Sequence, residues 1–216
     1  MTASIVILIS GRGSNMEAIV NAVVNGDISG KVAAVIANKP DAKGLFFAEK
    51  HGIDAICVDH SCYDDRQAFE AALIERIDAY QPTLVVLAGF MRVLTPSFVG
   101  HYGGRLLNIH PSLLPAFPGL NTHQRALDAG VKWHGCTVHF VTPELDCGPI
   151  IIQAAVPVLP DDDEHSLSER VLTMEHQIYS QAIVWFVNDQ LSIEKACVRV
   201  HNAEAPQFRL YQLEAQ

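Results

Sequence analysis

The sequence has little positive charge. Its 15 lysines and arginines are outnumbered by 24 aspartates and glutamates, which gives a formal charge of -9 at pH 7. A protein that binds a nucleic-acid backbone needs a basic patch to neutralise phosphates. This balance therefore argues against nucleic acid as a partner.

Long apolar runs and paired-cysteine motifs are also missing. No basic residue precedes the first apolar run, residues 5–9, which is shorter than the roughly 7 to 15 residues of a signal-peptide core. No stretch approaches the roughly 18 apolar residues that span a bilayer. The five cysteines form no C-x-x-C motif, which fits neither a disulfide framework nor a zinc site. We expect a cytoplasmic protein with free thiols and no membrane partner.

What the first half of the chain does contain is a regular alternation of apolar runs and amphipathic segments. The pattern predicts strands at 5–9, 32–38, 54–58 and 84–89, and helices at 16–26, 43–52 and about 64–80. Strands that are apolar throughout and alternate with helices indicate a parallel sheet covered on both faces. The expected fold is a doubly wound, Rossmann-like α/β sheet.

After about residue 105 the pattern changes. A strand is expected at 105–110, a short helix at 122–130, and consecutive strands at 135–141 and 150–158. Apolar residues then keep a helical period over 166–188, which predicts one long amphipathic helix. Since no linker or repeat is visible, we expect one domain over 1–216. It has an antiparallel C-terminal extension and a short tail from about residue 196.

A glycine-rich turn, "SGRGSN", separates the first expected strand from its helix. Free N–H groups at a helix start favour an anion. The turn has Gly11 and Gly13, but Met16 stands where a dinucleotide fingerprint has its third glycine, and no G-K-[ST] ending follows. A phosphate site and a simple tight turn both remain open.

The stretch "NIHPSLLPAFPG", residues 108–119, places Asn108 and His110 two residues apart at the end of an expected strand. Their side chains share one face, at the edge where open α/β sheets bind ligands. An amide and an imidazole there could stabilise an oxygen that becomes negative, and the imidazole could move a proton. The alternative is a polar pair that satisfies loop carbonyls.

Asp146 lies in the second turn-rich segment, "TPELDCGP". A carboxylate beside His110 would orient its ring and favour its charged form. The alternative is an ordinary turn aspartate before Gly148.

Two other features could suggest a metal. The acidic run 161–164 is better explained as capping of the following helix. His134 and His139 are five residues apart on an expected strand, so they point to opposite faces. We expect no metal.

Several long stretches, in order along the chain, resemble the folate-dependent formyltransferases: "LISGRGSN", "NKPDAKGL", "VVLAGFMRVL", "RLLNIHPSLLPAFPG", "TVHFVTPELDCGPIIIQ" and "RVLTMEHQIY". The resemblance implies transfer of a formyl group from 10-formyltetrahydrofolate to the amine of glycinamide ribonucleotide, in purine biosynthesis. It implies only small-molecule partners, no metal, and a monomer or a homodimer.

The resemblance also implies roles for individual residues. Asn108 and His110 would stabilise the formyl oxygen, and Asp146 would support His110 and help transfer protons. The ribonucleotide would be held by Gly13, Ser14 and Asn15 at its phosphate and by Glu175 at its ribose. The folate would be contacted by Arg66, Met91, Arg92, Val93, Leu94 and Asn108. A cis peptide is implied between Leu114 and Pro115.

Two positions depart from the family pattern. Cys147 stands where a small residue is expected, and Leu172 where relatives often carry a polar or basic side chain near the phosphate. We hypothesise that Arg12 supplies the compensating positive charge. Two other functions remain alternatives: hydrolysis of formyltetrahydrofolate by a deformylase, which normally carries an additional N-terminal domain, and a non-catalytic anion-binding module.

Overall fold

The computed structural model describes residues 2–202 and 206–212, and it divides into two compact units. Unit 1 comprises Met1–Asn108 and Val141–Pro143, and unit 2 comprises Ile109–Phe140 and Glu144–Gln216. The expectation of a single domain stays a prediction. The C-terminal positions 203–205 and 213–216 of the expected tail lie outside the described residues.

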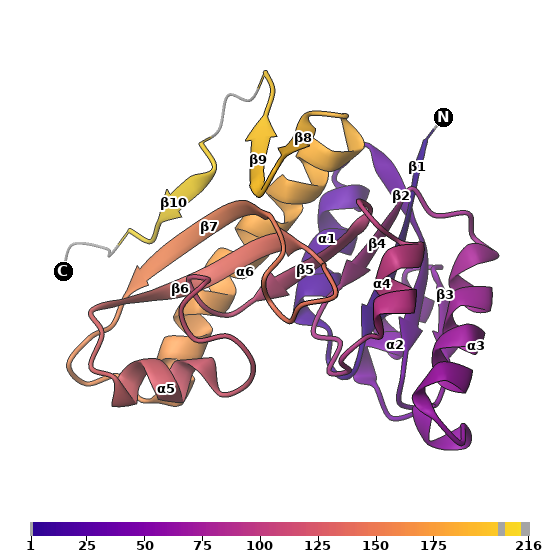
Figure 1. Cartoon of the computed structure of the whole chain (residues 1–216), viewed down its shortest axis with the longest axis horizontal. Coiled ribbons are helices and arrows are strands. Elements are labelled where there is room, and N and C mark those ends of the chain that lie inside the picture. Colours follow the sequence, from indigo (N-terminus) through magenta and orange to yellow (C-terminus); the bar gives the residue numbers. More distant parts are fainter. Residues whose placement is uncertain (1, 203–205, 213–216) are drawn as a thin grey trace. The chain divides into compact units, whose positions relative to one another are not determined.

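Unit 1 is built around a parallel sheet (Figure 1). Its strands follow the order β5-β4-β1-β2-β3, in which every neighbouring pair is parallel. Their bounds are β1 Ala3–Ile9, β2 Gly30–Ala37, β3 Asp54–Cys57, β4 Leu84–Leu87 and β5 Leu106–His110, whose last two residues belong to unit 2. The helices are α1 Ser14–Val24, α2 Lys43–Lys50, α3 Arg66–Asp78, α4 Pro96–His101 and the short η1 His60–Cys62.

The core of unit 1 follows from strand alternation. Val6 and Leu8 of β1 point to the face where Phe69 of α3 and Phe98 of α4 complete one apolar cluster. Residues of the opposite parity, such as Ile7, face the other side and are also fully buried. A sheet buried on both faces has no solvent-facing stripe, which is why its strands are apolar throughout.

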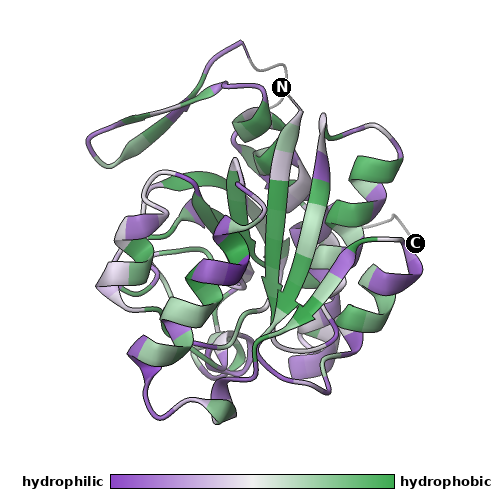
Figure 2. Ribbon diagram, turned by 90° about the vertical axis from the view of Figure 1, so that its right-hand side faces the viewer, coloured by the Kyte–Doolittle hydropathy of each residue, from purple (hydrophilic) through white to green (hydrophobic). Residues whose placement is uncertain are grey.

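Unit 2 contains an antiparallel pair and the long helix. Its elements are α5 Thr122–Asp128, β6 Trp133–Phe140, β7 Ile150–Pro157, α6 Glu164–Val187, β8 Leu191–Glu194, β9 Cys197–Val200 and β10 Phe208–Leu210. β6 and β7 are antiparallel, β10 runs parallel along β7, and β8 and β9 form a separate hairpin. α6 packs on β6 and β7. Figure 2 shows the hydrophobic strands beside helices that alternate between hydrophobic and hydrophilic residues.

The expected α/β class, the antiparallel extension and the long C-terminal helix are confirmed. The acidic run before α6 also caps it, because Asp163 accepts a 2.8 Å hydrogen bond from the Ser166 N–H. The sequence pattern does not predict η1, α4, β8, β9 or β10, which all have six residues or fewer. Among the described residues, no helix has the length and apolarity needed to cross a membrane.

Candidate active site

The glycine-rich turn between β1 and α1 forms one wall of a cavity of about 270 Å³ in unit 1. Gly13 precedes the first residue of α1 and has a φ of +75°, a left-handed conformation that glycine adopts without strain. The cavity is lined by the turn and by residues that follow β2 and β4: Ser10, Gly11, Arg12, Gly13, Ser14, Asn15, Lys39, Ala88, Gly89 and Met91.

Hydrogen bonds hold this turn in place. The Ser10 hydroxyl donates to Oδ1 of Asn38 at 2.6 Å and accepts the Met91 N–H at 2.7 Å. The Gly44 N–H donates to the Gly11 carbonyl at 3.1 Å. A Cβ at Gly44 would lie 2.8 Å from the Arg12 carbonyl oxygen, so only glycine permits this approach. The wall of the cavity is therefore fixed by the segments that follow β2 and β4 and by the start of α2.

The cavity suits an anion. It brings together Gly13, Ser14 and Asn15, the three residues expected at a phosphate, with the start of helix α1. Arg12 and Lys39 add two positive charges to its lining. Sequence reasoning gave Lys39 no role, although its place directly after an expected strand at the ligand edge of the sheet could have pointed to it.

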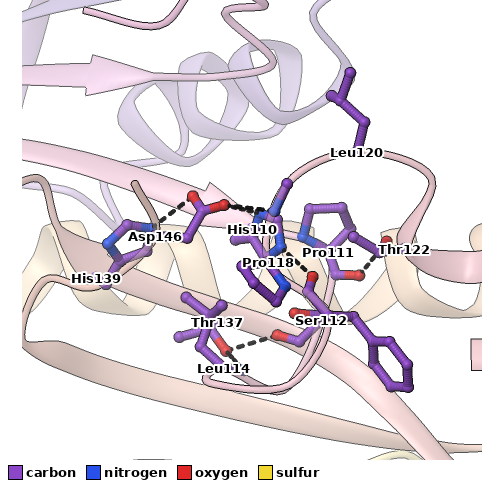
Figure 3. A network of polar contacts seen from close by, with 12 residues as sticks. His110, Pro111, Ser112, Leu114, Pro118, Leu120, Thr122, Thr137, His139 and Asp146 are labelled. Carbon is purple, nitrogen blue, oxygen red and sulfur yellow. Dashed lines mark hydrogen bonds and ion pairs between the residues drawn. The ribbon is translucent and has the colours of Figure 1, made fainter. Parts of the chain in front are cut away.

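His110 ends β5 and is buried in unit 2 (Figure 3). Its Nε2 lies 2.9 Å from the carbonyl oxygen of Phe117. A carbonyl only accepts hydrogen bonds, so Nε2 carries a hydrogen and donates it. The ring is thereby tied to the loop that follows its own strand.

Asp146 lies against the other side of this ring. Its Oδ2 is 3.5 Å from Nδ1 of His110, and both side chains are 7% exposed. The same oxygen accepts the Gly119 N–H at 2.9 Å. Asp146 itself has a φ of +53°, as a turn aspartate can. It is thus a turn residue whose carboxylate also faces the histidine.

A second histidine faces the same carboxylate. Nε2 of His139 lies 4.0 Å from Oδ1 of Asp146. Burial lowers the pKa of His139, while the Phe140 carbonyl and Asp146 act in the opposite direction. From the sequence, the only role considered for His139 is that of a metal ligand. The alternation of side chains along a strand could not predict the face on which His139 lies, because the register of β6 against β7 shifts between Val138 and His139.

The remaining expected site residues lie on several elements. Asn108 stands two residues before His110 on β5, and Glu175 is buried on α6. Of the residues expected at the folate, Arg66, Met91 and Val93 are exposed, Arg92 is partly exposed, and Leu94 packs in the apolar cluster of unit 1. Their contacts with folate stay predictions. The peptide between Leu114 and Pro115 is cis, as expected.

No metal centre is evident in the described part of the chain. Within residues 2–202 and 206–212, no three histidine, cysteine, aspartate or glutamate side chains are grouped so that they could hold a metal ion. His134 packs edge-on against the rings of His123 and Phe117 instead.

A match to a known protein family shows which family this chain belongs to. Residues 3–183 match the family model described as formyl transferase. The chain belongs to the formyl transferase family. The resemblance to formyltransferases expected from the sequence motifs is confirmed.

Three formyl transferases resemble this chain over most of its length. The chain is 53% identical over 192 residues to the phosphoribosylglycinamide formyltransferase of Escherichia coli (strain K12), covering 89% of this chain and 91% of that protein. Glycinamide ribonucleotide transformylase 1 from Symbiobacterium toebii has a TM-score of 0.91 at 49% identity, over 93% of this chain and 95% of that one. A phosphoribosylglycinamide formyltransferase from Coxiella burnetii, solved with CHES, has a TM-score of 0.90 at 43% identity, over 98% and 100% of the chains.

Proposed function

We propose that this formyl transferase acts in purine biosynthesis. It transfers the formyl group of 10-formyltetrahydrofolate to the amine of 5-phosphoribosylglycinamide. The products are N-formylglycinamide ribonucleotide and tetrahydrofolate. It acts in the cytoplasm, as a monomer or a homodimer, with folate as cosubstrate and without a metal.

The observation that carries this proposal is the buried His110–Asp146 pair. Nδ1 of His110 lies 3.5 Å from Oδ2 of Asp146. The chain that holds this pair is 53% identical to the phosphoribosylglycinamide formyltransferase of Escherichia coli (strain K12). A carboxylate next to an imidazole stabilises the ring when it gains a proton. Acyl transfer needs such a group, because negative charge builds on the carbonyl oxygen in the transition state.

The reaction divides into two steps. The amine nitrogen attacks the formyl carbon, forming a C–N bond while the carbonyl π electrons move to oxygen. Nε2 of His110 then donates to this oxygen instead of to the Phe117 carbonyl, and the Asn108 amide is the second donor. The tetrahedral carbon next expels N10 of the folate. One proton passes from the amine to N10, with Asp146 helping its transfer, so charge and atoms balance.

Binding is shared among other residues. Gly13, Ser14 and Asn15 hold the phosphate of the ribonucleotide, supported by Arg12, and Glu175 accepts hydrogen bonds from the ribose hydroxyls. The folate meets Met91, Val93, Leu94 and Asn108, while Arg66 and Arg92 face its anionic glutamate tail. The cavity at the start of α1 supports the phosphate assignment, since it combines a helix N-terminus with the positive charges of Arg12 and Lys39.

One assay separates this function from its alternatives. Production of tetrahydrofolate from 10-formyltetrahydrofolate is followed spectrophotometrically, with and without glycinamide ribonucleotide. We expect turnover only when the ribonucleotide is present. Equal turnover without it would identify a deformylase, and no turnover under either condition would identify an anion-binding module. Either result would overturn the proposal.

A further inference from the structure

Most hydrogen bonds of the loop of residues 110–119 involve a side chain. Three of its residues are prolines, which have no N–H to donate to a neighbouring strand. Its carbonyl groups nonetheless find partners. Side chains of Thr122, Thr137, Gln153, Ser112, His110 and Arg125 donate, respectively, to the carbonyls of Pro111, Ser112, Leu114, Ala116, Phe117 and Pro118.

Thr137 of β6 is the buried centre of this arrangement. Its hydroxyl donates to the Ser112 carbonyl at 2.7 Å and accepts the Leu114 N–H at 3.1 Å. Its second lone pair accepts from Nε2 of Gln153 at 3.0 Å. A hydroxyl has one hydrogen and two lone pairs, so the Thr137 hydroxyl is saturated. Removing any one partner leaves one hydrogen-bonding position of this buried hydroxyl unfilled.

Gln153 of β7 completes the arrangement from the next strand. Nε2 of its side chain also donates to the Leu114 carbonyl at 3.0 Å. Both hydrogens of the amide are therefore used, one on the loop and one on the threonine that holds the loop. The backbone of Gln153 is fixed as well, because its N–H donates to the Gln207 carbonyl beside β10.

We infer that Gln153 is a positioning residue for His110. It fixes the loop at Leu114, and the same loop carries Phe117, whose carbonyl holds Nε2 of His110, and Gly119, whose N–H holds Asp146. Loss of the Gln153 bonds loosens both anchors of the catalytic pair. The consequence for turnover rests on the proposed formyl transfer, whereas the consequence for the loop does not.

The first test replaces Gln153 by residues of similar length. Gln153→Met removes both donated hydrogens, and Gln153→Glu keeps the shape but turns a carboxylate oxygen toward the Leu114 carbonyl. A shift of about 1 Å in a catalytic group can lower a rate about 10²-fold. We expect kcat to fall about tenfold or more in both variants, with less than twofold change in KM for glycinamide ribonucleotide. Parental kcat in both variants would overturn the inference.

A matched control is available in the same unit. Nε2 of Gln190 also donates to two backbone carbonyls, those of His201 and Asn202, but far along the chain from the loop. Gln190→Met is expected to keep the parental kcat. An equal loss in Gln190→Met and Gln153→Met would mean that the effect is general destabilisation, which contradicts a positioning role.

A double-mutant cycle tests whether Gln153 acts through His110. If it does, Gln153→Met costs little once the imidazole is gone, since interacting sites are not additive. We expect less than a twofold further loss of kcat when Gln153→Met is added to His110→Ala. Full multiplication of the two losses would overturn the inference.

The last measurement is independent of enzymatic turnover. Amide hydrogen exchange is followed in the peptide spanning 108–119, in the parental protein and in Gln153→Met. We expect the Leu114 N–H to exchange at least tenfold faster in the variant, because its acceptor Thr137 has lost a partner. If the parental protein were inactive but this exchange rose, only the proposed function would fail. Unchanged exchange would refute the positioning role itself.

Discussion

Oδ2 of Asp146 lies 3.5 Å from Nδ1 of His110, and both side chains are withdrawn from solvent. Water screens charges at this depth less than it does at the surface. The carboxylate also accepts the Gly119 N–H, which fixes its position. In the proposed mechanism, this fixed carboxylate orients the His110 ring.

Asp146→Asn removes the negative charge and keeps the shape. We expect kcat to fall about 10²-fold or more, the scale of a lost contribution to proton transfer. Steady-state kinetics and thermal unfolding of the purified variant measure the effect. The matched control is Asp78→Asn, whose carboxylate lies 2.8 Å from His101 in an exposed pair of unit 1. Similar losses in both variants would contradict the role of Asp146.

We expect replacement of either proposed oxyanion donor to lower kcat by a similar factor. Asn108→Ala and His110→Ala are each expected to lower kcat about 10²- to 10³-fold, because one preorganised donor contributes about that much. Circular dichroism should show that both variants stay folded. His165→Ala, at an exposed histidine paired with Glu169, should keep parental turnover. Near-parental turnover in a folded Asn108→Ala or His110→Ala variant would refute that residue's role.

Arg12 is expected to contribute to binding and not to the chemical step. Arg12→Ala removes one of the two cations that line the cavity at the start of α1. We expect KM for glycinamide ribonucleotide to rise about tenfold, the scale of one hydrogen bond to a charged group, with kcat nearly unchanged. Initial rates at varied ribonucleotide measure this. Lys50→Ala, on the exposed end of α2, is the control, and an unchanged KM in Arg12→Ala would rule out the assignment.

His134 makes stability depend on pH. It is 1% exposed, and burial, followed by the nearby His123 ring, lowers its pKa to about 4. An unfolded chain binds this proton near pH 6.5, so the unfolded state holds more protons between pH 6.5 and 4. The contribution of His134 is fully present above pH 6.5 and is lost as the pH falls toward 4. Between pH 7 and 5 the loss is about 2 kcal/mol.

Urea unfolding at pH 7 and pH 5 checks this dependence. We expect the free energy of unfolding of His134→Gln to fall by about 2 kcal/mol less than that of the parental protein over this interval. His201→Gln, at an exposed histidine of the C-terminal region, should behave like the parent. An NMR titration of the His134 ring gives its pKa directly, and a midpoint near 6.5 would contradict the expectation.

The first half of the fold could be predicted from the sequence because its signals are local. β1, the glycine turn and α1 are neighbours along the chain, and an apolar run followed by an amphipathic one describes them. The three residues of β10 show no such pattern. β10 exists because it pairs with β7, and its sequence alone cannot indicate that partner.

In the candidate site, too, some residues could be predicted from local sequence and others could not. Asn108 and His110 share one short strand, so their spacing and the prolines behind them could be interpreted directly. His139 and Gln153 could not be assigned in this way. Each contacts a partner distant in sequence, and the irregular register of β6 at His139 breaks the alternation that would have predicted the face on which its side chain lies.

By itself, the sequence determined the acidic balance, the alternation of strands and helices, and the motifs that mark a formyl transferase. These features depend on composition and on the order of residues over short stretches of sequence, which are the same in the unfolded and the folded chain. Only the tertiary structure decided that Asp146 faces His110 and His139, and that Gln153 and Thr137 hold the proline loop. Such contacts need strand registers and turn geometries that form only when distant segments pack together.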